Sequence, residues 1–345
     1  MVRVLIVDDS AFMRNALSNM LSSDAEINIV GTARDGLEAV QKAARLKPDI
    51  ITMDVDMPMM DGIEALRRIM EKTPVPVIMV SSLTTEGASA TIKALELGAV
   101  DFIPKNLSEL SVNILKIKPM LIEKIKLIAR KGMPAVRRRQ SAPPAGGGMD
   151  AAWRMSGRRI GLVSIGTSTG GPRTLQEIIP TFPKDFPVPL VVAQHMPRNF
   201  TRTFADRLNQ LSRIVVKEAE DGEPLKNGVA YIAPGGGHIR LVRRGIDVFV
   251  NIFKNDEYIY RPSVDHLLFS SAECFPGRCL AVILTGMGND GLKGAEAVKK
   301  EGGRVFAQDE ETCTVYGMPR AVVEAGVVDK ILPAHEIAGE IINSV

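Results

Sequence analysis

A short stretch of glycines and hydroxyl residues, "GTSTGG" at residues 166–171, follows directly after an apolar run. Three chemistries use such a stretch. A Walker-type phosphate loop needs Lys and then Ser or Thr after its second glycine, but Pro172 and Arg173 follow here. A dinucleotide-binding fingerprint needs a glycine where this chain has Ser168. The pattern G-x-S-x-G instead matches a serine nucleophile on a sharp turn between a strand and a helix, although a purely structural turn remains the alternative.

A serine hydroxyl becomes a nucleophile only when a neutral imidazole takes its proton. His195 is the best-placed base, because it follows the apolar run 189–194 one βα unit after Ser168. Parallel strands end on one edge of their sheet, which brings the two residues together. The other three histidines suit packing or surface roles: His238, His266 and His335.

The imidazolium formed during such a reaction needs an acceptor that fixes its tautomer. Asp290 is the first candidate, because it lies in the glycine-rich stretch "LTGMGNDG", 284–291, after another apolar run, and Asp309 is the reserve candidate. Such a loop also offers backbone N–H groups to a developing oxyanion. A phosphate-binding loop is the alternative for this stretch. Ser168, His195 and Asp290 together favour a Ser-His-Asp triad.

A second group of reactive side chains lies near the N-terminus. Asp8 and Asp9 close the first predicted strand, and Asp54 closes the third. Carboxylates that converge repel one another unless a cation neutralises them, and oxygen ligands suit Mg²⁺. Ser81 and Lys105 end the fourth and fifth predicted strands and add a hydroxyl and a cation at the same edge. The set predicts phosphorylation on an aspartate.

The elements that position these groups form two predicted domains separated by a linker. From residue 1 to 128, short β-branched runs alternate with amphipathic stretches, which predicts five parallel strands with covering helices. Residues 129–157 are rich in Pro, Gly, Ser, Ala and Arg and predict a flexible linker. The βα rhythm resumes over 158–345, where the runs 238–244 and 246–253 predict an antiparallel hairpin beside a parallel sheet.

Composition excludes several classes of protein. The 43 basic and 40 acidic residues nearly balance, so no charge pattern indicates a nucleic-acid partner. The three cysteines are too few for a disulfide framework, which favours a reducing cytoplasm. Acids at Asp8 and Asp9 interrupt any signal peptide, and no apolar run is long enough to insert into a membrane. We therefore expect a soluble cytoplasmic protein.

Residues 1–128 resemble the receiver domain of two-component response regulators, which implies a flavodoxin-like fold. The resemblance implies Asp54 as the phosphoacceptor and Lys105 as the cation that pairs with the phosphate. The implied Mg²⁺ ligands and switch residues are Asp8, Asp9, Asp54, the Asp56 carbonyl, Ser81 and Phe102. Asn106 stands where receivers usually have proline, which departs from the family's Lys-Pro turn.

The order of receiver, linker, "GTSTGG", "QHMP" and "LTGMGNDG" resembles the methylesterase response regulators of bacterial chemotaxis, the protein-glutamate methylesterases/protein-glutamine glutaminases. The resemblance implies an α/β hydrolase domain built on a doubly wound parallel sheet. It implies Ser168 as the nucleophile, His195 as general base and acid, and Asp290 as the residue that orients His195. It also implies the Met287 amide as an oxyanion donor and Thr169 as a supporting contact.

The implied substrates are γ-glutamyl methyl esters on chemoreceptors, hydrolysed to glutamate and methanol, and certain receptor glutamines, deamidated with release of ammonia. The esterase chemistry needs no cofactor. The resemblance further implies that a chemotaxis histidine kinase supplies the phosphate for Asp54, and that phosphorylation uncovers the hydrolase site. Two rivals are a DNA-binding regulator, for which no basic helix-turn-helix segment is evident, and a nucleotide-binding output domain that uses its glycine-rich loops without hydrolysis.

Overall fold

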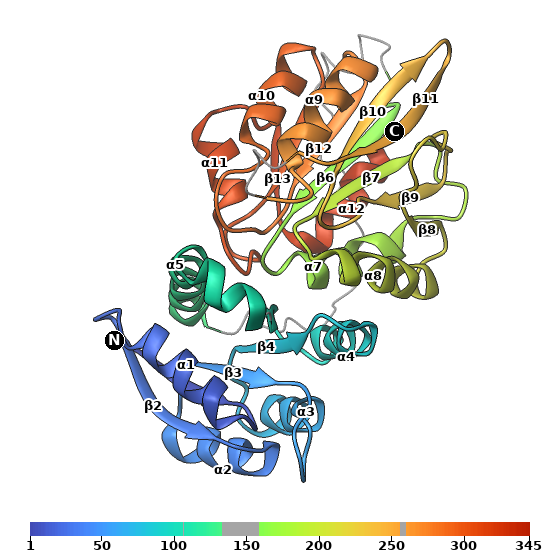
Figure 1. The fold of residues 1–345 in the computed structure, drawn as a ribbon. Helices are drawn as coiled ribbons and strands as arrows, with labels where there is room; N and C mark the ends of the chain where they lie inside the picture. Colours follow the sequence, from blue (N-terminus) through green and yellow to red (C-terminus); the bar gives the residue numbers. More distant parts are fainter. Residues whose placement is uncertain (106, 133–158, 256–259) are drawn as a thin grey trace. The chain divides into compact units, whose positions relative to one another are not determined.

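The chain folds as two compact units, Met1–Ala135 and Val136–Val345. The computed structural model describes four stretches of chain: 1–105, 107–132, 159–255 and 260–345. Asn106 and most of the predicted linker lie outside the described residues. Each unit has its own parallel sheet with helices on both faces (Figure 1).

The first unit is a parallel five-stranded sheet with strand order β2-β1-β3-β4-β5. Its strands are β1 (Val2–Val7), β2 (Ile27–Ala33), β3 (Ile50–Asp54), β4 (Val77–Ser82) and β5 (Asp101–Lys105). Its helices are α1 (Ala11–Leu21), α2 (Gly36–Leu46), α3 (Gly62–Lys72), α4 (Thr85–Glu96) and α5 (Leu107–Lys131). Helices α1 and α5 pack together on one face, and α2, α3 and α4 cover the other. The five predicted parallel strands are confirmed.

Helices of the first unit begin soon after the strands that precede them, because side chains cap their first turns. Ser10 accepts a hydrogen bond from the Met13 amide at the start of α1, and Asp61 and Thr84 cap α3 and α4 in the same way. Each cap satisfies an amide that the helix itself leaves unpaired. The parallel pairing of β1 with β3 and of β3 with β4 brings the carboxyl ends of these strands together at one edge of the sheet.

The second unit is a parallel seven-stranded sheet, ordered β14-β13-β12-β6-β7-β9-β8, with a separate antiparallel hairpin β10-β11. Its strands are β6 (Leu162–Thr167), β7 (Leu190–Gln194), β8 (Val215–Glu218), β9 (Val229–Ile232), β10 (His238–Arg244), β11 (Asp247–Phe253), β12 (Cys279–Ile283), β13 (Arg304–Gln308) and β14 (Lys330–Leu332). Its longer helices are α7 (Gly171–Ile178), α8 (Arg198–Leu211), α9 (Val264–Cys274), α10 (Leu292–Lys300), α11 (Met318–Glu324) and α12 (Ala334–Ser344).

Helices cover both faces of this second sheet, as a doubly wound fold requires (Figure 1). Helices α7, α8 and α12 pack on one face, α9, α10 and α11 pack on the other, and the hairpin lies against α9. The central strands β6, β7 and β12 are buried along their whole length, which explains their nearly continuous apolar sequences. The predicted α/β fold with a hairpin is confirmed, although the short strands β8 and β14 were not anticipated.

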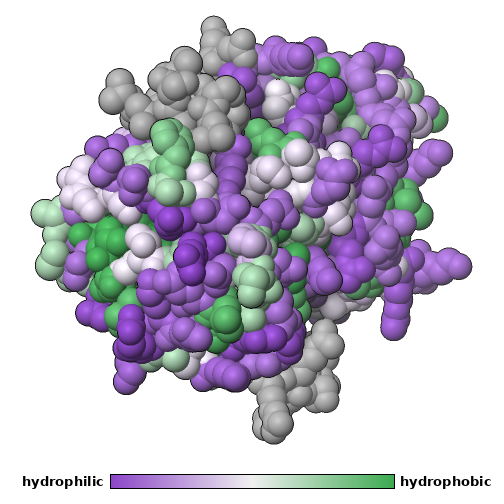
Figure 2. All heavy atoms as spheres, turned by 60° about the horizontal axis from the view of Figure 1, so that its bottom comes forward, coloured by the Kyte–Doolittle hydropathy of each residue, from purple (hydrophilic) through white to green (hydrophobic). Residues whose placement is uncertain are grey.

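The face of the molecule drawn in Figure 2 is mostly hydrophilic. Figure 2 shows charged and polar side chains over most of the visible face, with hydrophobic groups in small separate areas. Among the helices in the described part of the chain, none is long and apolar enough to cross a membrane.

Candidate functional site

Ser168 lies on a sharp turn between β6 and α7. Strand β6 ends at the residue before it, and α7 begins three residues later. Gly170 adopts a left-handed backbone with φ +79°, and a Cβ atom there would lie only 2.3 Å from the Thr314 hydroxyl oxygen. Pro172 occupies the first turn of the helix, where its missing N–H costs nothing. The turn leaves Ser168 partly exposed at the carboxyl edge of the sheet.

Thr285, just beyond the neighbouring strand β12, holds this turn. Its carbonyl oxygen accepts from the Ser168 amide at 3.0 Å and from the Thr167 hydroxyl at 2.8 Å. Its own hydroxyl donates to the Thr169 carbonyl at 2.9 Å. The next residue, Gly286, lies so close that a Cβ atom on it would be 2.9 Å from the Ser168 Cβ. Glycine therefore permits the loop after β12 to approach the serine.

His195 directly follows β7, the strand that pairs with β6, which Ser168 follows. Thr167 of β6 pairs with Gln194 of β7, and the His195 amide donates to the Thr167 carbonyl at 3.1 Å. The imidazole Nε2 lies 2.8 Å from the Asp290 Oδ2, and since a carboxylate only accepts, Nε2 carries the proton. The other nitrogen, Nδ1, is buried with no hydrogen-bond partner among the described residues.

The Asp290 carboxylate lies at the N-terminus of α9. It accepts from the Ser263 hydroxyl at 3.1 Å, from the Val264 amide at 2.7 Å and from the Asp265 amide at 3.0 Å. Burial raises the pKa of Asp290, but the hydrogen bonds from His195 and these amides outweigh burial, so its pKa lies below the ordinary value. Asp290 is therefore held as an anion facing His195.

A second carboxylate, from α9, accepts hydrogen bonds from the segment that carries Asp290. Asp265 of α9 accepts from the Gly291 amide at 3.0 Å and from the Gly294 amide at 2.8 Å. Each acid thus caps the segment that carries the other, which fixes the loop of Asp290 against α9. Sequence reasoning missed this support, although Ser263 before the apolar run of α9 is a typical helix-capping signal.

We expect Asp290→Asn to destabilise the second unit at neutral pH, by about 1–3 kcal/mol, because charge-assisted hydrogen bonds are lost. A folded-state pKa below the unfolded one stabilises the fold above pH 3.8 and loses that contribution as pH falls. The difference in unfolding free energy between wild type and variant should therefore stay constant from pH 7 to about pH 5 and shrink as pH falls below 3.8 toward the folded-state pKa. Urea titrations followed by hydrogen exchange of β6 and β12 peptides measure it. A difference that does not shrink between pH 3.8 and about pH 2 would contradict the role of the charge.

The remaining candidates of the second unit lie as follows. Thr169 and Met287 are buried on the turn and on the loop after β12. Among the described residues, the Met287 amide donates to no protein group, so it is available to a ligand. Asp309 is not brought to His195; its carboxylate accepts from the Thr312 amide at 2.9 Å and from the Thr312 hydroxyl. Asp290 alone of the two candidate acids bonds to the imidazole.

The other three histidines lie on different elements. His238 is buried at the start of β10, where its Nε2 bonds to the Asn255 carbonyl at 3.0 Å. His266 lies within α9, and its ring and those of His238 and Phe253 pack with centroids 5.3 to 5.4 Å apart. His335 is exposed on α12. These positions agree with the packing and surface roles predicted for the three.

The acidic residues of the first unit meet at the carboxyl edge of its sheet. Asp8 and Asp54 are buried, Asp9 is exposed, and one carboxylate oxygen from each lies within 4.8 Å of the others. Arg14 donates to the carbonyls of Asp8 and Asp9 at 2.7 and 2.9 Å and so fixes their loop. Sequence reasoning missed Arg14. Three carboxylates in this arrangement fit a small oxygen-binding cation such as Mg²⁺.

Lys105 reaches into the same cluster. Its Nζ lies 2.6 Å from the Asp54 Oδ2 and 2.9 Å from the Asp8 Oδ2. Burial raises the pKa of Asp54 to about 6, against the lowering effect of Lys105. Burial lowers the pKa of Lys105, but its contacts with Asp54 and Asp8 raise the pKa by more than burial lowers it. The net pKa lies above the ordinary value, so the amine stays charged. At this edge, Asp54 therefore lies among the Lys105 cation and two further acids, Asp8 and Asp9.

The residues implied as switches flank this edge. Ser81 is fully buried, and its hydroxyl donates to the Gly87 carbonyl of α4 at 3.1 Å. Phe102 is buried on β5. Asp56 lies two residues beyond Asp54 with an exposed side chain, which is compatible with a role for its backbone carbonyl alone.

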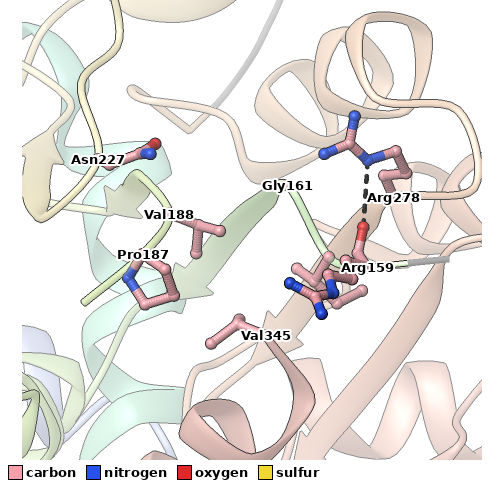
Figure 3. A pocket seen from close by; sticks show the side chains of 8 residues that line it. Arg159, Gly161, Pro187, Val188, Asn227, Arg278 and Val345 are labelled. Carbon is pink, nitrogen blue, oxygen red and sulfur yellow. Dashed lines mark hydrogen bonds between the residues drawn. The ribbon is translucent and has the colours of Figure 1, made fainter. Parts of the chain in front are cut away.

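A pocket of about 300 Å³ in the second unit is lined by none of Ser168, His195 and Asp290. Gly161, Val188 and Arg278 line it, and they precede β6, β7 and β12, so it opens at the amino ends of the strands (Figure 3). The Ser168 turn is at the carboxyl ends. This pocket has no part in the chemistry of Ser168.

Comparisons with known proteins cover the whole chain. A family model for the CheB methylesterase matches residues 163–341, and one for the response regulator receiver domain matches residues 4–113. The chain is 49% identical to the protein-glutamate methylesterase/protein-glutamine glutaminase of Thermotoga maritima, over 100% of this chain and 98% of the relative. It is 44% identical to a Pyrococcus abyssi protein of the same name, over 100% and 94%.

A solved structure matches the second unit. The crystal structure of the Thermotoga maritima CheB methylesterase catalytic domain aligns with a TM-score of 0.53 and 51% sequence identity. The alignment covers 54% of this chain and 99% of that chain.

Proposed function

The chain belongs to the CheB methylesterase family, and we propose that Ser168, His195 and Asp290 carry out its protein-glutamate methylesterase and protein-glutamine glutaminase reactions. It is a hydrolase joined to a response regulator receiver domain, which makes its activity phosphorylation-regulated. The observation that carries the site assignment is the 2.8 Å hydrogen bond between His195 and Asp290, together with the pairing of Thr167 and Gln194, the residues that precede Ser168 and His195.

The first half of the reaction transfers the glutamyl group to the serine. With Nε2 bound to Asp290, Nδ1 is the nitrogen left to take the Ser168 proton. The serine oxygen then forms a bond to the ester carbonyl carbon. When the bond from that carbon to the methoxy oxygen breaks, the imidazolium returns its proton to the leaving oxygen and methanol departs. Asp290 stabilises the imidazolium without itself taking a proton.

The second half hydrolyses the acyl-serine. Nδ1 of His195 takes a proton from water, the water oxygen bonds to the carbonyl carbon, and the bond to the serine oxygen breaks as the serine regains its proton. The product is glutamate. With a glutamine side chain as substrate, the leaving group of the first half is ammonia and the second half is unchanged.

The negative oxygen of each tetrahedral intermediate needs donors at a fixed place. The Met287 amide suits this role, because it is available and the loop that carries it contacts Ser168 through Gly286. Thr169 supports the site from the turn, since its carbonyl is bound by Thr285. No cofactor enters this scheme.

We propose three regions: a receiver domain over 1–128, a linker over 129–157 and a methylesterase catalytic domain over 158–345. Asp54 is the proposed phosphoacceptor. Asp8, Asp9, Asp54 and the Asp56 carbonyl would hold Mg²⁺, which supplies positive charge to a phosphoryl group when bound. Lys105 then pairs with the phosphoryl oxygens in place of its present contact with Asp54.

Phosphorylation is transmitted through the residues that flank Asp54. Ser81 leaves the Gly87 carbonyl to bond the phosphoryl group, and buried Phe102 repacks, which shifts the receiver between two states. Asn106, outside the described residues, replaces the proline usual after the lysine. The proposed partners are methyl-accepting chemoreceptors as substrates and a chemotaxis histidine kinase as phosphodonor, and the proposed location is the cytoplasm.

Incubation of the purified full chain with membranes that carry methylated chemoreceptors tests this function. We expect methanol release, and mass spectrometry of receptor peptides should show glutamate where specific glutamines stood. Both products should form faster with acetyl phosphate and Mg²⁺, because phosphorylation activates the enzyme. Receptors without methyl esters serve as the control for methanol. Absence of both products, with and without acetyl phosphate, would contradict the proposal.

A further inference from the structure

An aromatic ring packs against one face of the His195 imidazole. The Tyr260 ring stacks on it with centroids 4.6 Å apart and an angle of only 2° between the planes. Tyr260 comes from a different part of the chain, three residues before the Ser263 cap of α9. The imidazole is thus contacted at two places: its Nε2 bonds to Asp290, and one ring face packs against Tyr260.

A glycine makes room for the far end of the tyrosine. A Cβ atom on Gly288 would lie 3.1 Å from the Tyr260 hydroxyl oxygen. Gly288 has φ +85°, a left-handed conformation that favours glycine. The tyrosine therefore reaches from His195 to the loop that contains Met287 and Asp290.

The segment that contains Tyr260 also donates hydrogen bonds to the Asp290 carboxylate. Ser263, Val264 and Asp265 donate three hydrogen bonds to the Asp290 carboxylate. One short stretch of chain, 260–265, therefore contacts two members of the triad, His195 by its ring and Asp290 by its donors. Any shift of this stretch would move the base and its orienting acid together.

We propose that Tyr260 is a positioning residue, whose ring holds the plane of the His195 imidazole and stabilises the imidazolium that forms during turnover. This inference rests on the proposed function, because it assigns His195 as the base. A stacked ring restricts rotation of the imidazole about its hydrogen bond to Asp290 and so fixes the direction in which Nδ1 points. The electron-rich face of the phenol attracts the imidazolium more than the neutral imidazole.

Other groups near His195 bear on its protonation. Asp290 faces it across the Nε2 hydrogen bond, and Tyr260 faces it across the ring. Asp265 and His266 of α9 interact electrostatically with Asp290 from behind. Substitutions at Tyr260 leave these groups in place, so their effect on the pH profile isolates the ring.

Unnatural amino acids at position 260 of the full chain test the proposal. Tyr260→Phe keeps the ring and should change kcat less than about twofold. Phenylalanines with one, two and three ring fluorines keep the shape but remove electron density from the ring face. We expect kcat to fall stepwise, by about 3- to 30-fold in total, with KM unchanged. The acidic limb of the pH–rate profile should move stepwise to lower pH, because the imidazolium is less stabilised.

Tyr260→Leu adds a variant with similar apolar volume and no ring, and it should match the most fluorinated variant in its pH profile. A rate loss in Tyr260→Leu without any trend across the fluorine series would overturn the proposal, since packing alone explains that result. A flat series with wild-type kcat would also overturn it. Failure of the proposed function is distinguishable: Ser168→Ala would then retain wild-type hydrolysis, whatever position 260 contains.

Discussion

We expect Ser168→Ala to abolish methanol release from methylated chemoreceptors, with a loss of at least about a thousandfold in kcat. The alanine removes the oxygen that forms the acyl intermediate, and nothing on the turn replaces it. The turn itself persists, because its geometry depends on Gly170 and on the Thr285 bonds to the backbone and to Thr167. Methanol release and the unfolding temperature, measured on the same preparation, check the two parts of this expectation.

Ser212→Ala is the matched control for this substitution. Ser212 ends α8, and its hydroxyl has no hydrogen-bond partner among the described residues, so its removal should leave hydrolysis unchanged. Substantial methanol release by the Ser168 variant, with wild-type stability, would show that another group is the nucleophile. Loss of release in both variants would point to an unspecific effect of the substitutions.

We expect Asp54→Asn to remove stimulation by acetyl phosphate with Mg²⁺, so that stimulated and unstimulated rates become equal. An amide does not accept a phosphoryl group as a carboxylate does, and the Asp54→Asn variant therefore forms no acyl phosphate. Basal hydrolysis persists, because Ser168, His195 and Asp290 lie in the other unit. Initial rates of methanol release with and without the phosphodonor measure this, together with phosphate incorporation by intact-protein mass spectrometry.

Asp56→Asn is the companion variant. Its side chain is exposed, and the backbone carbonyl proposed as a ligand is kept by the substitution, so stimulation should remain. A stimulated Asp54 variant would place the phosphorylation site elsewhere. If the Asp56 variant lost stimulation and the Asp54 variant kept it, the two neighbouring acids would have been assigned in the wrong order.

Alternation of apolar runs with amphipathic stretches was enough to predict the parallel sheets of both units. Strands β1, β3, β4, β6, β7 and β12 are buried on both faces, so their sequences are almost continuously apolar. Strands β8 and β14 escaped prediction because they are short and only partly buried. A partly buried edge strand does not need a continuous run of apolar side chains. The neighbouring strand determines its pairing, which is β9 for β8 and β13 for β14.

The contacts that position His195 and Asp290 could not be predicted from the sequence for a different reason. Tyr260 contacts His195 across 65 residues of chain. Ser263 and Asp265 bond to Asp290 across 27 and 25 residues. No local pattern reports such a contact. Ser263 carried a capping signal, but the signal did not say that the capped helix would bind an aspartate from another loop. For Tyr260 there was no signal at all.

The sequence by itself determined which chemistry is available and at which edge it gathers. Residue type decides that Ser168, His195, Asp290 and Asp54 can act, and a parallel sheet requires that strand ends meet. Only the tertiary structure decided which acid faces the imidazole, which nitrogen carries the proton and what covers the ring. The physical reason is that these depend on distances of about 3 to 5 Å between segments remote in the chain, and such distances are set by packing rather than by local sequence.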